Sequence, residues 1–137
     1  MGFVYAEIKL KNAYDVSSFK RGFIKEGDIR QIIVKALVDT GAGTLVINEA
    51  LRQQLGLGIE GTRRAVLAND SKESVNIVEP VEIHWNDRNS ICKPLSASKS
   101  GGVLLGAIPL EDMDLIVDPV KQTLVGAHGD EVVSLLM

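Results

Sequence analysis

One acidic residue stands where the sequence is best arranged for chemistry. Asp39 ends the apolar run Ala36–Val38 and is followed by Thr40, Gly41 and Ala42. An apolar run that ends in an acid and a glycine predicts a strand end, where the backbone turns sharply and the acid faces a cleft. A carboxylate in a cleft can act as a general acid or base. The same residues also occur in ordinary turns, so a second feature has to distinguish the two interpretations.

A second apolar run that ends in glycine supplies this feature. Residues 103–106 read Val-Leu-Leu-Gly, far downstream of Asp39. Together with Leu-Val-Asp-Thr-Gly-Ala at residues 37–42, they resemble the two signatures of retropepsin-like aspartic proteases, the single-domain kind that works as a homodimer. The resemblance spans roughly residues 29–126. It implies an all-β, barrel-like acid protease fold with one or two short helices.

The sequence around the two signatures favours one branch of this family. Gly43 stands where the retroviral enzymes usually carry Ser or Asp, and Ala107-Ile108 replaces a polar pair. Residues 105–111 and 115–119 are instead similar to the C-terminal half of small bacterial and archaeal retropepsin-like proteins. We therefore interpret the chain as resembling that branch, with residues 11–28 as an insertion.

The resemblance implies a specific division of catalytic work. Hydrolysis of a peptide by an activated water needs one group to remove the proton of the water and another to polarise the carbonyl. Two carboxylates that share one proton do both. The chain has a single Asp-Thr-Gly, so the second Asp39 has to come from a second subunit of a homodimer. Thr40 is expected to hydrogen-bond to the partner loop, and Gly41 to keep a Cβ away from the paired acids.

The substrate is expected to lie under a flap. Turn-forming residues near Asn69-Asp70 predict a β-hairpin over residues 62–75. The family places its flap at this distance after the acid, although a plain surface hairpin stays open as an alternative. The Arg63-Arg64 pair beside it is interpreted as part of a solvated face. The residues implied to bind a peptide or protein substrate are Ala42, Val66, Leu67, Ala68, Asn69, Gly102 and Leu104.

Hydrophobic patterning predicts the strands that position these residues. Residues 4–10 alternate apolar and polar side chains with the period of a half-buried strand. Residues 29–38 are predicted to form the strand that delivers Asp39. Further strands are predicted over residues 44–47, 75–85 with a bend at Glu79-Pro80, 91–95, 115–117 and 122–125.

Two short helices and one loop complete the predicted fold. Asn48 is a suitable N-cap for a helix that carries Leu51 and Leu55. Pro109 suits the first turn of a second helix that ends near Met113. Residues 11–20 show no periodicity and are predicted to be a loop.

Length and composition predict one soluble domain over residues 1–137. Hydrophobic residues make up 45% and charged residues 24%, which are values of a folded globular protein. A net charge of −3 and an aromatic content of 4% do not support binding to nucleic acid or to a membrane. Cys92 has no partner for an internal disulfide, which suggests a cytoplasmic location, and we interpret it as a half-buried hydrophobe. Two histidines are too few for a zinc site, so no metal or cofactor is expected.

Two other functions remain open beside aspartic endopeptidase. Residues 39–44 also resemble the phosphate loop of actin-like and sugar-kinase ATPases, whose two large domains need more than 137 residues. The domain could also be a retropepsin-like scaffold that binds peptides or mediates dimerisation with little turnover. The presence of Asp39 favours catalysis over binding alone.

Overall fold

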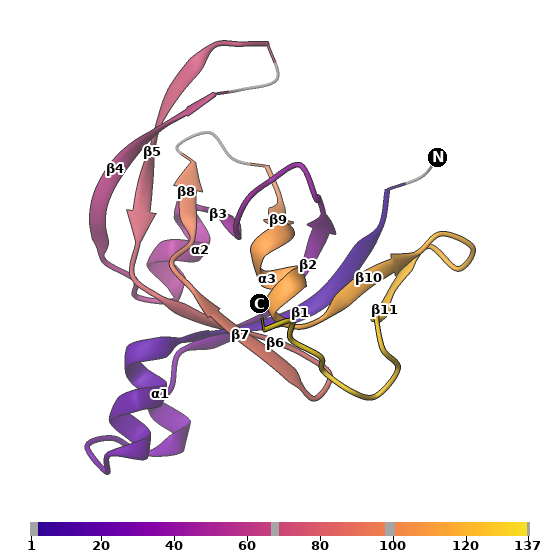
Figure 1. The fold of residues 1–137 in the computed structure, drawn as a ribbon. Helices are drawn as coiled ribbons and strands as arrows, with labels where there is room; N and C mark the ends of the chain where they lie inside the picture. The colour runs from indigo at the N-terminus through magenta and orange to yellow at the C-terminus, as the bar shows by residue number, and fades with distance from the viewer. Residues whose placement is uncertain (1–2, 67–68, 98–100, 137) are drawn as a thin grey trace.

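Strands dominate the computed structural model, which describes residues 3–66, 69–97 and 101–136. The described strands are β1 (Tyr5–Asn12), β2 (Gln31–Val38), β3 (Val46–Asn48), β4 (Ile59–Val66), β5 (Lys72–Val78), β6 (Val81–Trp85), β7 (Arg88–Cys92), β8 (Leu95–Ala97), β9 (Val103–Leu105), β10 (Leu115–Asp118) and β11 (Thr123–Gly126). Nine of these described strands form one curled sheet in the order β4-β5-β8-β3-β9-β2-β1-β6-β7, and β10 pairs with β11 in a separate hairpin (Figure 1). The predicted all-β, barrel-like fold class is therefore confirmed.

The strand that carries Asp39 lies inside the large sheet. β2 pairs antiparallel with β1 on one side and parallel with β9 on the other, where Leu37 is opposite Leu104. β3 pairs with the far side of β9 through Val46 and Leu104. Because β2 and β3 flank β9, the segment that connects them has to cross the end of β9. This crossing places Asp39 beside residue 106.

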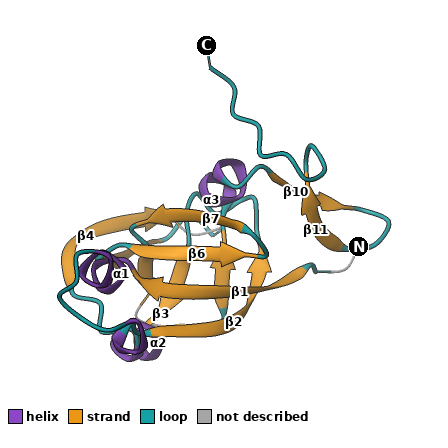
Figure 2. Ribbon diagram, turned by 90° about the horizontal axis from the view of Figure 1, so that it is seen from below, coloured by secondary structure: helices purple, strands orange, loops and turns teal. Residues whose placement is uncertain are grey.

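The described part of the chain also contains three short α-helices: α1 (Ala13–Lys20), α2 (Glu49–Gln54) and α3 (Ala107–Asp112). A 3-10 turn, η1 (Glu26–Asp28), follows α1. Figure 2 shows α1 and α2 at one end of the curled sheet and the β10–β11 hairpin at the other end. None of the described helices is both long and apolar enough to cross a membrane.

The loop predicted over residues 11–20 is wrong, because α1 occupies most of it. Asn12 caps the helix by accepting a hydrogen bond from Asp15 N at 3.1 Å, and its Nδ2 donates to Leu55 O at 2.9 Å. Val16 is the only buried residue of α1, so the helix leaves almost no apolar period in the sequence. The structure therefore has one helix more than the one or two expected.

The hairpin predicted over residues 62–75 is present, and the strand predicted after it is divided in two. β4 and β5 form the hairpin expected over residues 62–75, and it begins at Ile59 and ends at Val78. The long strand predicted over residues 75–85 is bent at Glu79-Pro80, as expected. The bend divides it into β5, which pairs with β4 and β8, and β6, which pairs with β1 and β7.

Two charged side chains hold the C-terminal segment, residues 126–133, against the rest of the chain. Arg88 is 6% exposed and donates to the carbonyls of Met113, Asp114 and Gly129. Asp114 Oδ2 lies 2.7 Å from His128 Nδ1 and accepts a hydrogen bond from Val133 N at 3.0 Å. Beyond this attachment the chain is exposed, with Leu135 and Leu136 at 86% and 95%.

Candidate active site

Gly106 packs closely against the loop that follows β2, residues 39–44, which we call the braced loop. A Cβ at this position would lie 2.3 Å from Thr44 O and 2.6 Å from Ala42 O, both backbone atoms. Only a glycine allows the loop to pass this close to the end of β9. The first residues of α3 add two hydrogen bonds, from Ala107 N to Ala42 O at 2.8 Å and from Ile108 N to Gly43 O at 3.0 Å. The first backbone amides of a helix have no partner within the helix, and two of them here hold the loop in place.

The carboxylate of Asp39 is set by its own turn. Asp39 N donates to Leu105 O at 3.0 Å, and Ala42 N donates back to Asp39 O at 3.1 Å. Oδ1 accepts a hydrogen bond from Gly41 N at 2.9 Å, and a Cβ on Gly41 would lie 3.1 Å from that oxygen. Within the described part of the chain, Oδ2 accepts no hydrogen bond. The half-buried carboxylate thus has one oxygen available to a water or to a second carboxylate.

Asp39 extends one face of the sheet that is apolar and half-buried. Residues paired across a sheet share a face, and side chains two positions apart along a strand do the same. Leu37 precedes Asp39 by two residues and is paired with Leu104, so both belong to this face. Cross-strand pairs extend this half-buried face through β3, β8 and β5. The face then consists of Leu37, Leu104, Val46, Leu95 and Ile77.

The opposite face of the same strands is the protein core. Ile47, Leu105 and Ala36 are fully buried, and Ser96 is 1% exposed. Its hydroxyl donates to Glu49 Oε2 on α2 at 2.6 Å. The half-buried face is therefore the one on which a ligand can lie beside Asp39. We call this face the apolar floor.

The structure brings together most of the predicted site residues near β2. Asp39, Thr40, Gly41 and Ala42 lie in the braced loop, and Leu104 lies on the apolar floor. Gly102 is exposed just before β9.

Val66 and Asn69, two of the predicted flap residues, belong to the β4–β5 hairpin, which projects beyond the rest of the sheet in Figure 1. Val66 ends β4 and is 66% exposed, and Asn69 is exposed in the turn. Leu67 and Ala68 lie outside the described residues.

Sequence reasoning left four members of the apolar floor out of the site. Leu37 could have been found from its two-residue spacing to Asp39. Val46, Leu95 and Ile77 carry no such signal, because they join the floor only through pairing between distant strands.

Cys92 lies behind the loop rather than in the site. Burial raises the pKa of its thiol, while contacts with the Thr44 side chain and the Leu45 backbone lower it by less. A protonated, half-buried thiol is a poor nucleophile. This agrees with its interpretation as a small hydrophobe.

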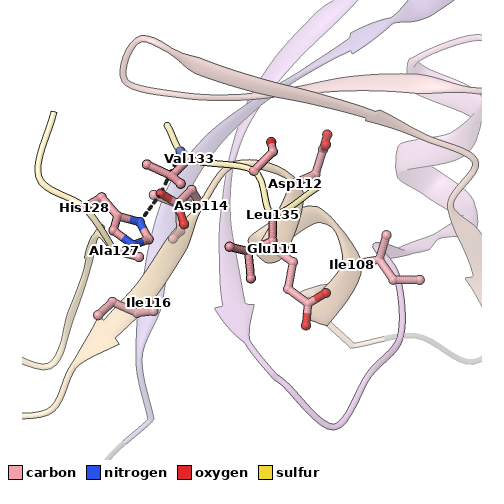
Figure 3. Close-up of a pocket in the computed structure, with 11 residues that line it drawn as sticks. Ile108, Glu111, Asp112, Asp114, Ile116, Ala127, His128, Val133 and Leu135 are labelled. Carbon is pink, nitrogen blue, oxygen red and sulfur yellow. Dashed lines mark hydrogen bonds and ion pairs between the residues drawn. The ribbon is translucent and has the colours of Figure 1, made fainter. Parts of the chain in front are cut away.

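A cavity of about 710 Å³ lies between α3, β10 and the C-terminal segment (Figure 3). Ile108, Glu111, Ile116 and Leu135 are among the residues that line it, and Asp39 is not. Figure 3 shows the His128–Asp114 pair at its edge. Ile108 connects the cavity to the braced loop through its hydrogen bond to Gly43 O.

Comparisons with known proteins identify the fold. No family model matches the sequence, and no curated protein matches it significantly. The retroviral protease-like domain of Ddi1 from Leishmania major is similar in structure, with a TM-score of 0.54 and 14% identity over 91% of this chain and 88% of that chain. A retropepsin-like aspartic protease from Rickettsia conorii has a TM-score of 0.48 and 16% identity over 85% of this chain and 77% of that chain. The likeness to the Leishmania domain shows that this chain has the retroviral protease-like, or retropepsin-like, fold.

Proposed function

Because the chain has the retropepsin-like fold, we propose that it is an aspartic endopeptidase whose active site is completed by a second copy of the chain. The catalytic residues are Asp39, Thr40 and Gly41. The observation that carries the proposal is the Asp39 carboxylate itself. It is held by a braced turn at the edge of the apolar floor, with Oδ2 left without a partner in the described chain.

One carboxylate can perform only one of the two tasks of peptide hydrolysis, which are to remove a proton from water and to protonate the carbonyl oxygen. In the proposed dimer, two Asp39 side chains share a proton, because two like charges so close together do not both ionise easily. The ionised carboxylate takes a proton from a water molecule, and the protonated one donates to the carbonyl oxygen of the peptide as the water attacks. Collapse of the tetrahedral intermediate then transfers a proton to the leaving amine and restores the shared proton.

Exposed apolar side chains support the presence of a second copy. Ile108, Ile116 and Val132 are 62%, 51% and 52% exposed, and Leu135 is 86% exposed. They lie on α3, on β10 and in residues 132–135, and Ile108, Ile116 and Leu135 line the cavity of Figure 3. Apolar surface gathered in this way is typical of a protein interface. Ile108 also contacts the braced loop, so a partner that covers it would meet that loop.

An extended peptide is the substrate that suits the rest of the site. The apolar floor provides half-buried apolar side chains for the peptide to contact, among them Leu104 opposite Leu37, and Gly102 lies just before β9. In our proposal the flap pairs with the peptide backbone through residues 66–69 and excludes water when it closes. We place this activity in the cytoplasm, in keeping with the single unpaired Cys92.

Digestion of a peptide library by the native protein and by Asp39→Asn tests the proposal. The exposed acid of the β6–β7 turn provides a matched control, Asp87→Asn. We expect cleavage by the native protein and by the control, and none by Asp39→Asn. Cleavage that survives in Asp39→Asn would contradict the proposal. Peptide binding by all three proteins without cleavage by any would identify a binding scaffold instead.

A further inference from the structure

Two neighbouring arginines of the flap project from opposite faces of β4. Arg63 is paired with Val75, and Arg64 is paired with Ser74. Both arginines are exposed. Because successive side chains of a strand alternate between faces, only one of the two can lie on the same face as Asp39.

Strand register identifies that arginine as Arg63. Val75 lies two residues before Ile77, and Ile77 is paired with Leu95 on the apolar floor. Arg63 therefore shares the face of Ile77, Leu95 and, further along the floor, Asp39. Arg64 lies on the other face.

The charge of Arg63 is not neutralised within the described chain. The side chain of Arg63 makes no hydrogen bond or ion pair with any described residue. Glu60, an acid on the same strand, is paired with Lys93 at 3.0 Å. Glu73 shares the face of Arg63 and already has an interaction of its own. Arg63 is thus a cation without a partner in the described chain, on the same face of the sheet as the apolar floor.

The neighbours of Arg63 leave room for a ligand. Gly61 and Ala65, two residues before and after it, lie on the same face of β4 and have little or no side chain. A guanidinium in this position can reach towards the floor with its planar set of donors, which matches a carboxylate in a two-point hydrogen bond.

We propose that Arg63 is a specificity-determining residue that binds an acidic side chain of the peptide substrate. The proposal rests on the proposed function, because it places the peptide between the flap and the apolar floor. Arg63 lies three residues before the end of β4, which is about 10 Å along a strand. We place the acid it selects along β4, away from the cleaved bond, and Arg63 takes no part in the chemical step.

Matched peptides and two charge-reversal variants test this assignment. A cleaved peptide is synthesised with Glu, Gln or Lys at each position in turn, and kcat/KM is measured for the native protein, Arg63→Glu and Arg64→Glu. The native protein is expected to prefer Glu to Gln at one position by about fivefold, the factor of a partly exposed ion pair. Arg63→Glu is expected to prefer Lys there, whereas Arg64→Glu keeps the native preference. Arg63→Met checks that loss of the charge alone removes the preference.

Binding measurements separate failure of this proposal from failure of the proposed function. The same peptides, labelled with a fluorophore, are titrated with Asp39→Asn protein that carries either native Arg63 or Arg63→Glu. Tighter binding of the Glu peptide that is lost in Arg63→Glu supports the role of Arg63, even if no protein cleaves the peptides. Equal binding and cleavage of Glu and Gln peptides, or equal effects of the two reversals, would overturn it.

Discussion

The loop of Asp39 and the C-terminal segment are held in place by different kinds of contact. The loop, residues 39–44, is fixed by backbone hydrogen bonds to β9 and α3 and by the close approach of Gly106. Residues 126–133 are fixed largely by two charged side chains, Arg88 and Asp114. Backbone amides do not titrate, whereas the carboxyl of Asp114 does. The geometry around Asp39 should therefore tolerate changes of pH that loosen the C-terminal segment.

This difference has a consequence for the proposed dimer. The C-terminal segment borders the cavity of Figure 3 and the exposed apolar residues that a second copy would cover. Loss of its attachment should weaken association before it disturbs the carboxylate. The next three predictions test the two kinds of contact separately, in decreasing order of expected effect.

Replacement of Gly106 by Ala should have the largest effect, because the new Cβ would meet backbone atoms that cannot move aside. We expect the free energy of unfolding to fall by about 3 kcal/mol, as for severe overpacking of a core. Urea denaturation at neutral pH measures the change.

The control for this variant is Gly43→Ala in the same loop, where a Cβ would meet nothing within 4 Å. Its free energy of unfolding should stay within about 0.5 kcal/mol of the native value. Equal effects of the two variants would show that the loop is not braced at Gly106.

Replacement of Arg88 by Met should release the C-terminal segment and leave the loop intact. The change removes the donors to Met113, Asp114 and Gly129, and partly buried carbonyls are left without partners. We expect a loss of about 2 kcal/mol in the free energy of unfolding. Hydrogen exchange should accelerate at residues 126–133 and stay unchanged at residues 39–44. The exposed Arg64→Met serves as control, and faster exchange in both segments would contradict the distinction between them.

Replacement of Asp114 by Asn should have the smallest effect and should depend on pH. The hydrogen bond to His128, followed by that from Val133 N, holds the pKa of Asp114 below its usual value. A carboxyl with a lowered pKa stabilises the fold above about pH 4, and this contribution is lost as the pH falls further. Asn accepts the left-handed backbone of this position, where φ is 54°, so the variant tests the charge rather than the turn.

Urea denaturation of Asp114→Asn at pH 6 and at pH 3 checks this prediction. The variant should be less stable than the native protein at pH 6, and the difference should shrink at pH 3. Asp130→Asn, an exposed acid of the same segment, is the control. A difference of the same size at both pH values would rule out the ionised carboxylate as its cause.

The sequence predicted the parts of the fold that depend on local pattern. Alternating side chains in residues 4–10 and the N-cap Asn48 specify their elements within a few residues of chain, and β1 and α2 were found as expected. The apolar run before Asp39 likewise predicted the end of β2. Helix α1 was not predicted because Val16 is its only buried residue, so it leaves no apolar period in the sequence. Its stability comes from the Asn12 cap and from Asp15, which is paired with Arg30 at 2.8 Å.

The parts that depend on contacts between distant strands could not be predicted in this way. The faces on which Arg63 and Leu95 lie relative to Asp39 follow from the register of six strands, β4-β5-β8-β3-β9-β2, and one-residue slips would reverse them. The close approach of Gly106 to Thr44 likewise needs the order β3-β9-β2. The attachment of the C-terminal segment to Arg88 joins residues up to 43 positions apart.

Mixing the native protein with Asp39→Asn tests most directly whether each active site needs Asp39 from two chains. The two proteins are unfolded together, refolded in varied ratios at constant total concentration, and assayed on a cleaved peptide. If two copies share one site, activity falls as the square of the native fraction, to about one quarter in an equal mixture. A linear fall, to about one half in an equal mixture, would show that each chain acts alone and would contradict the account.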